Sequence, residues 1–176
     1  MTRLAAIAAL LIPFAAAPAA AAAPAQACAV TWGSQPKNAA PTARGHVTDV
    51  RGAPSPCYDR LVVDLGPASG DGYRVEYVLS LTEDPTGDPV PLRGGAVLRV
   101  VAESPAYDDA GNPTYTPANR AELVDVTGWP TLRQVAWAGS FEGQTTIGVG
   151  ARARLPFRAF TLTGPPRLVV DVAHQW

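Results

Sequence analysis

The chain has 176 residues, a formal net charge of −1 and a hydrophobic fraction of 47%. A chain of this length forms one ordinary domain with its own core. Nucleic acid is excluded as a partner, because binding it requires a strongly basic surface and this chain is nearly neutral. The basic residues are almost all arginine, and Lys37 is the only lysine.

The first 27 residues have the layout of a secretory signal peptide. Arg3 provides a short basic start, and the apolar stretch 4–17 follows it. A membrane-spanning helix needs about 20 apolar residues, and prolines interrupt this one, so a cleaved signal is favoured over a retained anchor. Small residues allow cleavage after Ala25 or after Ala27. Residues 28–176 are predicted to form the exported domain, without a transmembrane segment.

Cys28 follows the second of these cleavage positions directly and has two possible roles. A lipid-attachment site usually has a large aliphatic residue three places before the cysteine, and Ala25 stands there. The other role is a disulfide with Cys57, the only other cysteine, because paired cysteines are usual in an oxidising compartment. The disulfide is favoured, and closing a loop of about 30 residues would stabilise the domain by roughly 3–4 kcal/mol.

The exported part is predicted to be all-β, with little or no helix. Proline and glycine recur nearly every ten residues, and apolar residues alternate with the two-residue period of a strand. In the segment 146–154 the odd-numbered residues are predicted to face the core, while Gly148 and Gly150 face outward. This spacing of short, mostly antiparallel strands indicates a β-sandwich or barrel. The predicted strands cover 47–51, 60–65, 73–79, 98–100, 132–138, 146–154, 157–162 and 167–172.

Two long segments, 82–95 and 103–118, are rich in proline, glycine and acidic residues. Long loops on a β scaffold are commonly functional or mobile. The simpler interpretation, an exposed connection without a special role, is favoured for both.

One pattern occurs twice, at 60–65 and at 167–172: arginine, three aliphatic residues, aspartate and a further aliphatic residue. If the two strands pair antiparallel about their central valines, each arginine faces the aspartate of the other copy. Parallel pairing in register would set like charges side by side, which is unfavourable. The charges favour the antiparallel pairing, and two similar strands without direct contact are the alternative. The expected ion pairs are Arg60–Asp171 and Arg167–Asp64.

The sequence contains no recognisable catalytic apparatus, metal site or cofactor site. His46 and His174, the only histidines, lie in no motif with a nucleophile and an acid, so both are expected on the polar surface. The segment 148–153 has the spacing of a dinucleotide fingerprint, but a strand pattern continues where the helix should begin. The acidic residues at 83–88 and 108–112 lack the spacing of a calcium loop and are interpreted as turns. We therefore expect a protein that is not an enzyme.

Candidate binding residues follow from side-chain chemistry. Sugars are held by aromatic faces flanked by polar groups, although packing in the core is the favoured role for each tryptophan. Arg60 and Arg167 are predicted on the outer face, where they bind carboxylates of wall peptides or pair with the two aspartates, and pairing is slightly favoured. The aromatic candidates are Trp32, Trp129, Trp137, Trp176, Tyr58, Tyr107 and Tyr115.

Four segments together resemble the AMIN-like domains of exported actinobacterial proteins. They are WGS at 32–34, CYDRLVVDL at 57–65, GYRVEYV at 72–78 and RLVVDV at 167–172. The resemblance implies a sandwich of two β-sheets and, by more distant similarity to AMIN domains, localisation to the cell wall through peptidoglycan. We therefore expect a cell-envelope module that binds peptidoglycan, or alternatively one that binds a protein or is structural. The expected binding residues are Tyr58, Arg60, Trp137 and Arg167.

Overall fold

The computed structural model describes residues 28–43, 45–67 and 72–176. The predicted signal peptide, residues 1–27, lies outside the described residues. Those residues contain nine strands and no helix, so none of them forms a helix long and apolar enough to cross a membrane. The strands are β1 (Lys37–Ala39), β2 (Val47–Pro54), β3 (Tyr58–Leu65), β4 (Tyr73–Val78), β5 (Ala96–Ala102), β6 (Leu132–Phe141), β7 (Gln144–Ala151), β8 (Phe157–Thr163) and β9 (Pro166–Ala173).

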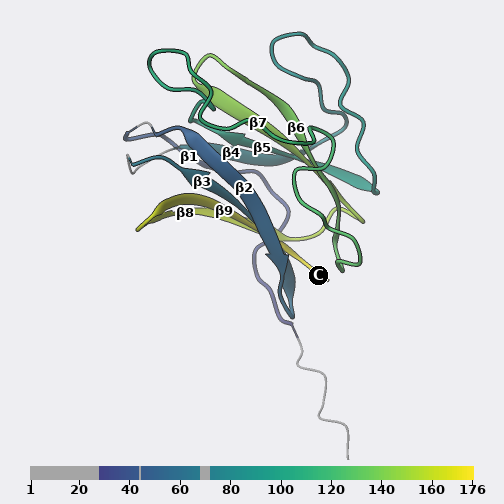
Figure 1. Cartoon of the computed structure of the whole chain (residues 1–176). Helices are drawn as coiled ribbons and strands as arrows, with labels where there is room; N and C mark the ends of the chain where they lie inside the picture. The colour runs from purple at the N-terminus through teal and green to yellow at the C-terminus, as the bar shows by residue number, and fades with distance from the viewer. Residues whose placement is uncertain (1–27, 44, 68–71) are drawn as a thin grey trace, which may run out of the picture.

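The strands form two antiparallel sheets that lie face to face (Figure 1). One sheet has five strands in the order β1-β4-β5-β7-β6, and the other has four in the order β2-β3-β9-β8. The predicted all-β, two-sheet sandwich is confirmed. Because β3 and β9 are central neighbours in the smaller sheet, segments from the two ends of the domain lie side by side.

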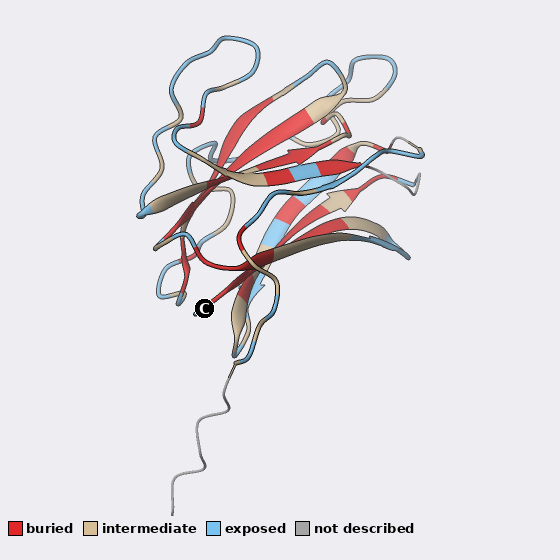
Figure 2. Ribbon diagram, turned by 180° about the vertical axis from the view of Figure 1, so that it is seen from behind, coloured by how far each residue is buried: buried red, intermediate tan, exposed pale blue. Residues whose placement is uncertain are grey.

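The core lies between the two sheets, where Figure 2 shows the buried segments of both layers. The alternation predicted from sequence places Leu61, Val63 and Leu65 inward, and all three are buried. They pack with residues such as Leu98 and Phe157 from other strands. Burying one such side chain stabilises the fold by about 1.5–3 kcal/mol.

The outward face of β7 is covered by the long connection between β4 and β5. Gly148 and Gly150 face outward as predicted, but Leu92 and Arg93 lie against them. A Cβ atom on Gly150 would lie 2.0 Å from the carbonyl oxygen of Arg93. The connection is otherwise largely exposed, as predicted. It can pack closely on the five-stranded sheet because Gly148 and Gly150 of β7 carry no side chain.

The second long connection protects an edge of the same sheet. The Leu123 amide donates to the Val135 carbonyl and the Trp137 amide donates to the Arg120 carbonyl, each at 2.7 Å. These bonds satisfy backbone groups of β6, the edge strand, which would otherwise be open to pairing with another chain. Both bonds come from the part of the β5–β6 connection that follows the predicted loop 103–118.

The antiparallel register of β3 and β9 is the one that the repeated pattern predicts. Val62 pairs with Val169, Arg60 faces Asp171, and Asp64 faces Arg167. The Arg60–Asp171 ion pair forms, with a shortest contact of 2.6 Å. The predicted Arg167–Asp64 pair is wrong: Arg51 of the edge strand β2 donates twice to the Asp64 carboxylate. Arg51 reaches it because β2 pairs with β3 on the side opposite β9.

His174 is not on the polar surface as predicted. Its Nε2 lies 2.9 Å from Oδ1 of Asp59, and its side chain is only 16% exposed. Asp59 is fully buried and also accepts hydrogen bonds from the backbone amides of Thr131 and Leu132, both at 2.8 Å. The Asp59 carboxylate therefore joins β3 of one sheet to the start of β6 in the other.

A bulge in β6 holds the first long connection through Gly139. The register of β6 with β7 shifts between Trp137 and Ser140, and Gly139 has a φ of 106°. A Cβ atom there would lie 2.2 Å from the carbonyl oxygen of Asp84, whose amide donates to the Ala138 carbonyl. The site therefore requires glycine both for its backbone conformation and for its space.

Gly139→Ala is expected to lower the free energy of unfolding by about 3 kcal/mol, because strain and a backbone collision add together. Gly87→Ala is the matched control. Gly87 also has a positive φ, 77°, but nothing lies within 4 Å of its Cβ position. The control should cost about 1 kcal/mol. Urea unfolding measures both values, and equal values would show that the contact with Asp84 contributes nothing.

Candidate functional site

The outer face of the four-stranded sheet carries a row of charged side chains from three strands. Arg60 of β3, Asp171 of β9 and Arg158 of β8 occupy opposite positions on neighbouring strands, with the acid in the centre. Arg60 donates from Nε and Nη2 to the two carboxylate oxygens at 2.6 and 2.8 Å, and Arg158 donates from Nε at 2.8 Å. Asp171 is fully buried, while the two arginine side chains are 34% and 39% exposed.

The row has more positive than negative charge. Two guanidinium groups share one carboxylate, and the hydrogen bond to Asp171 raises the pKa of Arg60 above its ordinary value. Within the described part of the chain, Nη1 of Arg60 and both Nη atoms of Arg158 have no hydrogen-bond partner. These nitrogens are donors available to an anionic ligand.

Three aromatic rings surround the guanidinium groups. The Cζ atom of Arg158 lies 4.5 Å from the ring centre of Trp32, 5.3 Å from that of Phe160 and 5.5 Å from that of Tyr58. Arg60 lies 5.2 Å from the Tyr58 ring centre. Such cation–π contacts hold a guanidinium plane in place. We call these residues the arginine–aromatic cluster: Trp32, Tyr58, Arg60, Arg158, Phe160 and Asp171.

Trp32 reaches the cluster through the segment 28–34, which is fixed at both ends. The predicted disulfide is confirmed, because Cys28 is bonded to Cys57, which directly precedes β3. At the other end, the Phe157 amide donates to the Gly33 carbonyl at 2.9 Å. The segment therefore runs from β3 to β8 at one end of the sheet, and Trp32 lies between them, 5.7 Å from the Tyr58 ring centre.

The structure brings together two of the four residues predicted to bind a ligand. Tyr58 and Arg60 belong to the cluster. Arg167 is on the same face but four residues from Asp171 along β9, about 13 Å in an extended strand. Its Nε donates to the Pro165 carbonyl. Trp137 lies in the other sheet.

The role predicted for the tryptophans, core packing, is confirmed for two of them. Trp137 is part of the core and Trp129 packs against it. The prediction is wrong for Trp176, which is 71% exposed, and for Trp32, which belongs to the surface cluster.

Sequence reasoning missed Arg158 and Phe160. Both lie on the outward side of β8, in the segment 157–162 that was predicted to be a strand. The two-residue alternation of that segment indicates that both side chains lie on the same face of the strand. It does not indicate which residues lie next to them, because only the pairing of β8 with β9 places Arg158 beside Asp171.

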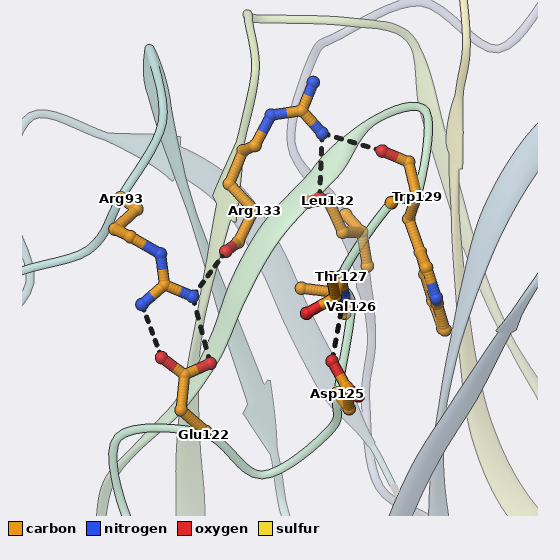
Figure 3. Close-up of a pocket in the computed structure, with 9 residues that line it drawn as sticks. Arg93, Glu122, Asp125, Val126, Thr127, Trp129, Leu132 and Arg133 are labelled. Atoms are coloured by element: carbon orange, nitrogen blue, oxygen red, sulfur yellow. Dashed lines mark hydrogen bonds and ion pairs between the residues drawn. The ribbon is translucent and has the colours of Figure 1, made fainter.

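A hollow of about 420 Å³ beside the edge of β6 has polar walls that are already paired (Figure 3). Arg93 forms an ion pair with Glu122 and also donates to the Arg133 carbonyl. Arg133 donates to the carbonyls of Trp129 and Leu132. These bonds hold the β4–β5 and β5–β6 connections against the five-stranded sheet. Because the polar side chains are used in them, the hollow offers few free groups to a ligand.

The other motifs raised by the sequence are structural. The glycines of the dinucleotide-like segment lie within β7, so no helix begins there. Asp108 accepts hydrogen bonds from the amides of Ala110 and Asn112, which confirms the predicted turn. The Asn112 side chain and then its backbone amide hold the pKa of Asp108 below its ordinary value. Among the described residues, no group of three or more potential ligands could hold a metal ion.

The fold and the cluster define a disulfide-linked antiparallel β-sandwich with a cationic, aromatic surface site. The chain belongs to the AMIN-like domain family, whose model matches residues 45–174. Domains of this family are non-catalytic targeting domains, and membership indicates a module associated with the cell wall. The family and the disulfide together indicate an extracytoplasmic protein. No curated protein and no solved structure matches the chain.

Proposed function

We propose that this protein is an exported, non-enzymatic module of the cell envelope that binds peptidoglycan through the carboxylates of its peptide stems. The observation that carries the proposal is the pair of guanidinium groups anchored to one buried carboxylate, with terminal donors left over. In this proposal, residues 1–27 direct export and the remaining chain acts outside the cytoplasm.

The geometry of the cluster suits a planar anion. Guanidinium groups bind carboxylates through paired, charge-assisted hydrogen bonds, which are among the stronger hydrogen bonds in proteins. Asp171 and the aromatic rings fix Arg60 and Arg158 before any ligand arrives. A preformed site loses less conformational entropy on binding, which increases affinity.

Chemistry distinguishes a peptide stem from an uncharged glycan at this site. The cluster has one more positive than negative charge, so an acidic group gains electrostatic attraction that a neutral sugar does not. The side chains of Trp32, Tyr58 and Phe160 also offer apolar area to the aliphatic parts of a stem peptide. A protein ligand with acidic side chains is the alternative partner.

The double variant Arg60→Lys/Arg158→Lys is expected to weaken binding to purified cell-wall sacculi at least about tenfold, as measured by co-sedimentation. Lysine keeps the positive charges beside Asp171, so the buried carboxylate is not left unpaired. It loses the planar fork of donors and the stacking on the aromatic rings. Circular dichroism and urea unfolding would verify that the variant is folded.

Arg167→Lys is the matched control, because it makes the same change on the same face outside the cluster and should leave pelleting unchanged. Sacculi whose carboxyl groups have been converted to amides should bind the wild-type protein as weakly as intact sacculi bind the double variant. Saturable pelleting that survives both changes would overturn the assignment of the site. No pelleting of the wild-type protein would favour a protein partner instead.

A further inference from the structure

A small polar hollow, of about 250 Å³, lies between the β4–β5 connection and the outer face of the five-stranded sheet. Its only apolar walls are Leu81 and Val101. The arginine–aromatic cluster lies on the other sheet, so the two sites are separate. We call this feature the Arg99 hollow, and its charged and amide walls are Arg74, Asp84, Arg99 and Gln144.

The strand register places opposite charges on two sides of the hollow. Arg74 of β4 and Thr146 of β7 both lie opposite Val101, which is on β5 between them. Neighbouring strands are about 4.8 Å apart, so the backbones at Arg74 and Thr146 are separated by roughly 10 Å. Asp84 lies on the Thr146 side, because its Oδ2 accepts from the Thr146 hydroxyl at 3.1 Å.

The basic side keeps donors for a ligand. Arg99 donates through Nη2 to Glu76 of β4, and its Nη1 has no partner among the described residues. Arg74 donates to Glu103 and to Oε1 of Gln144, which leaves the NH₂ group of that glutamine free to donate. These groups can bind a carboxylate through charge-assisted hydrogen bonds.

Arg99 is also incompletely satisfied by the protein. Its Nε is the one buried side-chain nitrogen or oxygen without a partner in the part of the chain that the structure describes. A buried donor of a charged group without a partner costs free energy. A carboxylate bound at the neighbouring Nη1 would offset part of that cost by electrostatic attraction.

The acidic side keeps an acceptor in a fixed position. Oδ1 of Asp84 has no partner within residues 28–43, 45–67 and 72–176, and the Asp84 amide donates to the Ala138 carbonyl at 2.9 Å. Across those residues no ion pair joins Asp84 to Arg74 or Arg99, although all three line the same hollow. Opposite charges therefore face each other across a space that a small molecule can fill.

We propose that the Arg99 hollow binds a small zwitterion, a free amino acid with a short side chain. Its carboxylate accepts from Arg99 and Gln144, and its ammonium group donates to Asp84. A simple anion is attracted by the arginines but repelled by Asp84, and a simple cation meets the reverse arrangement. One amino acid satisfies both sides, and the polar walls disfavour a long apolar side chain. The proposal does not depend on the function proposed for the cluster.

The arginine Nε–H signals of the ¹⁵N-labelled protein test this proposal. Solvent does not reach Nε of Arg99, so its proton should exchange slowly and give a visible signal, which Arg99→Lys assigns. Titration with glycine, and separately with L-serine, should shift this signal in a saturable way for at least one of the two. Acetate and methylammonium each carry one of the two charges, and both should bind at least about tenfold more weakly.

Asp84→Asn should weaken amino-acid binding about tenfold and abolish the preference over acetate, because asparagine keeps an acceptor for Thr146 but loses the negative charge. Asp88→Asn is the matched control, since it makes the same change in the same connection outside the walls of the hollow, and it should leave the affinity unchanged. The wild-type titrations need no variant, so poor folding of Asp84→Asn would not obscure the result. An unmoved Arg99 signal with both amino acids up to tens of millimolar would overturn the proposal. Acetate binding as tight as that of the amino acids would do the same, because it would mark a site for anions only.

Discussion

Asp59→Ala is expected to lower the free energy of unfolding by about 3–4 kcal/mol, the largest effect of any single substitution considered. The carboxylate accepts the amides of Thr131 and Leu132 and contacts His174. Alanine would leave two backbone donors without partners in the interior, where water cannot replace the carboxylate. It would also remove a link between the two sheets. Urea unfolding of the oxidised protein, followed by tryptophan fluorescence, measures the change.

Asp59→Asn separates the hydrogen bonds from the charge. The amide oxygen of asparagine can accept from Thr131 and Leu132, and its NH₂ group can donate to an unprotonated His174 nitrogen. We expect this variant to lose less than half of what the alanine variant loses. An equal loss in both would show that the negative charge of Asp59, and not its acceptor geometry, holds the two sheets together.

Removing the disulfide is expected to affect both stability and binding. Cys28→Ser/Cys57→Ser should lower the free energy of unfolding by about 3 kcal/mol, because the unfolded chain is no longer closed into a loop. The sequence separation of the two cysteines is 29. The segment 28–34 would also lose its anchor beside β3, so Trp32 would leave the Arg158 guanidinium. Unfolding measurements and sacculus pelleting on the same sample report the two effects.

Trp32→Ala distinguishes these two consequences of losing the disulfide. It keeps the cross-link and removes only the ring that contacts Arg158. We expect it to weaken pelleting nearly as much as the serine double variant, with a much smaller loss of stability. Full pelleting by the serine variant would contradict the role assigned to the segment 28–34. The disulfide also occupies the Cys28 sulfur, which disfavours the alternative role of Cys28 as a lipid-attachment site.

Trp32 lies outside the part of the chain that the family model matches. The match begins at residue 45, whereas Trp32 and Cys28 precede it. The other members of the arginine–aromatic cluster lie within the matched range. The chain therefore completes its surface site with a residue from outside the matched sandwich, and the disulfide places that residue. In our proposal, Trp32 adjusts the affinity of a site whose charged part belongs to the matched domain.

The sequence by itself determined the all-β class of fold and supplied a hypothesis for one central pairing, which the structure confirms. Alternation with a period of two identifies strands because successive side chains point to opposite faces, and this rule is local. If β3 and β9 are neighbours, their register is predictable as well, since the repeated pattern allows opposite charges to meet only when the strands run antiparallel. The disulfide was the favoured of two roles for Cys28, because two cysteines in an oxidising compartment are usually paired.

The tertiary structure alone decided which side chains form the site. Arg158 lies 13 residues from Asp171, and Arg60 lies 111 residues from it, so their meeting depends on the order of strands in the sheet. Asp64 pairs with Arg51 instead of Arg167 because a third strand brings in a competing guanidinium. His174 is partly buried because its ring contacts the Asp59 carboxylate, which also accepts the amides of Thr131 and Leu132 where the two sheets meet. The local sequence pattern shows which face of a strand a side chain lies on. Which side chains lie next to it on that face depends on how strands distant in sequence pair and pack.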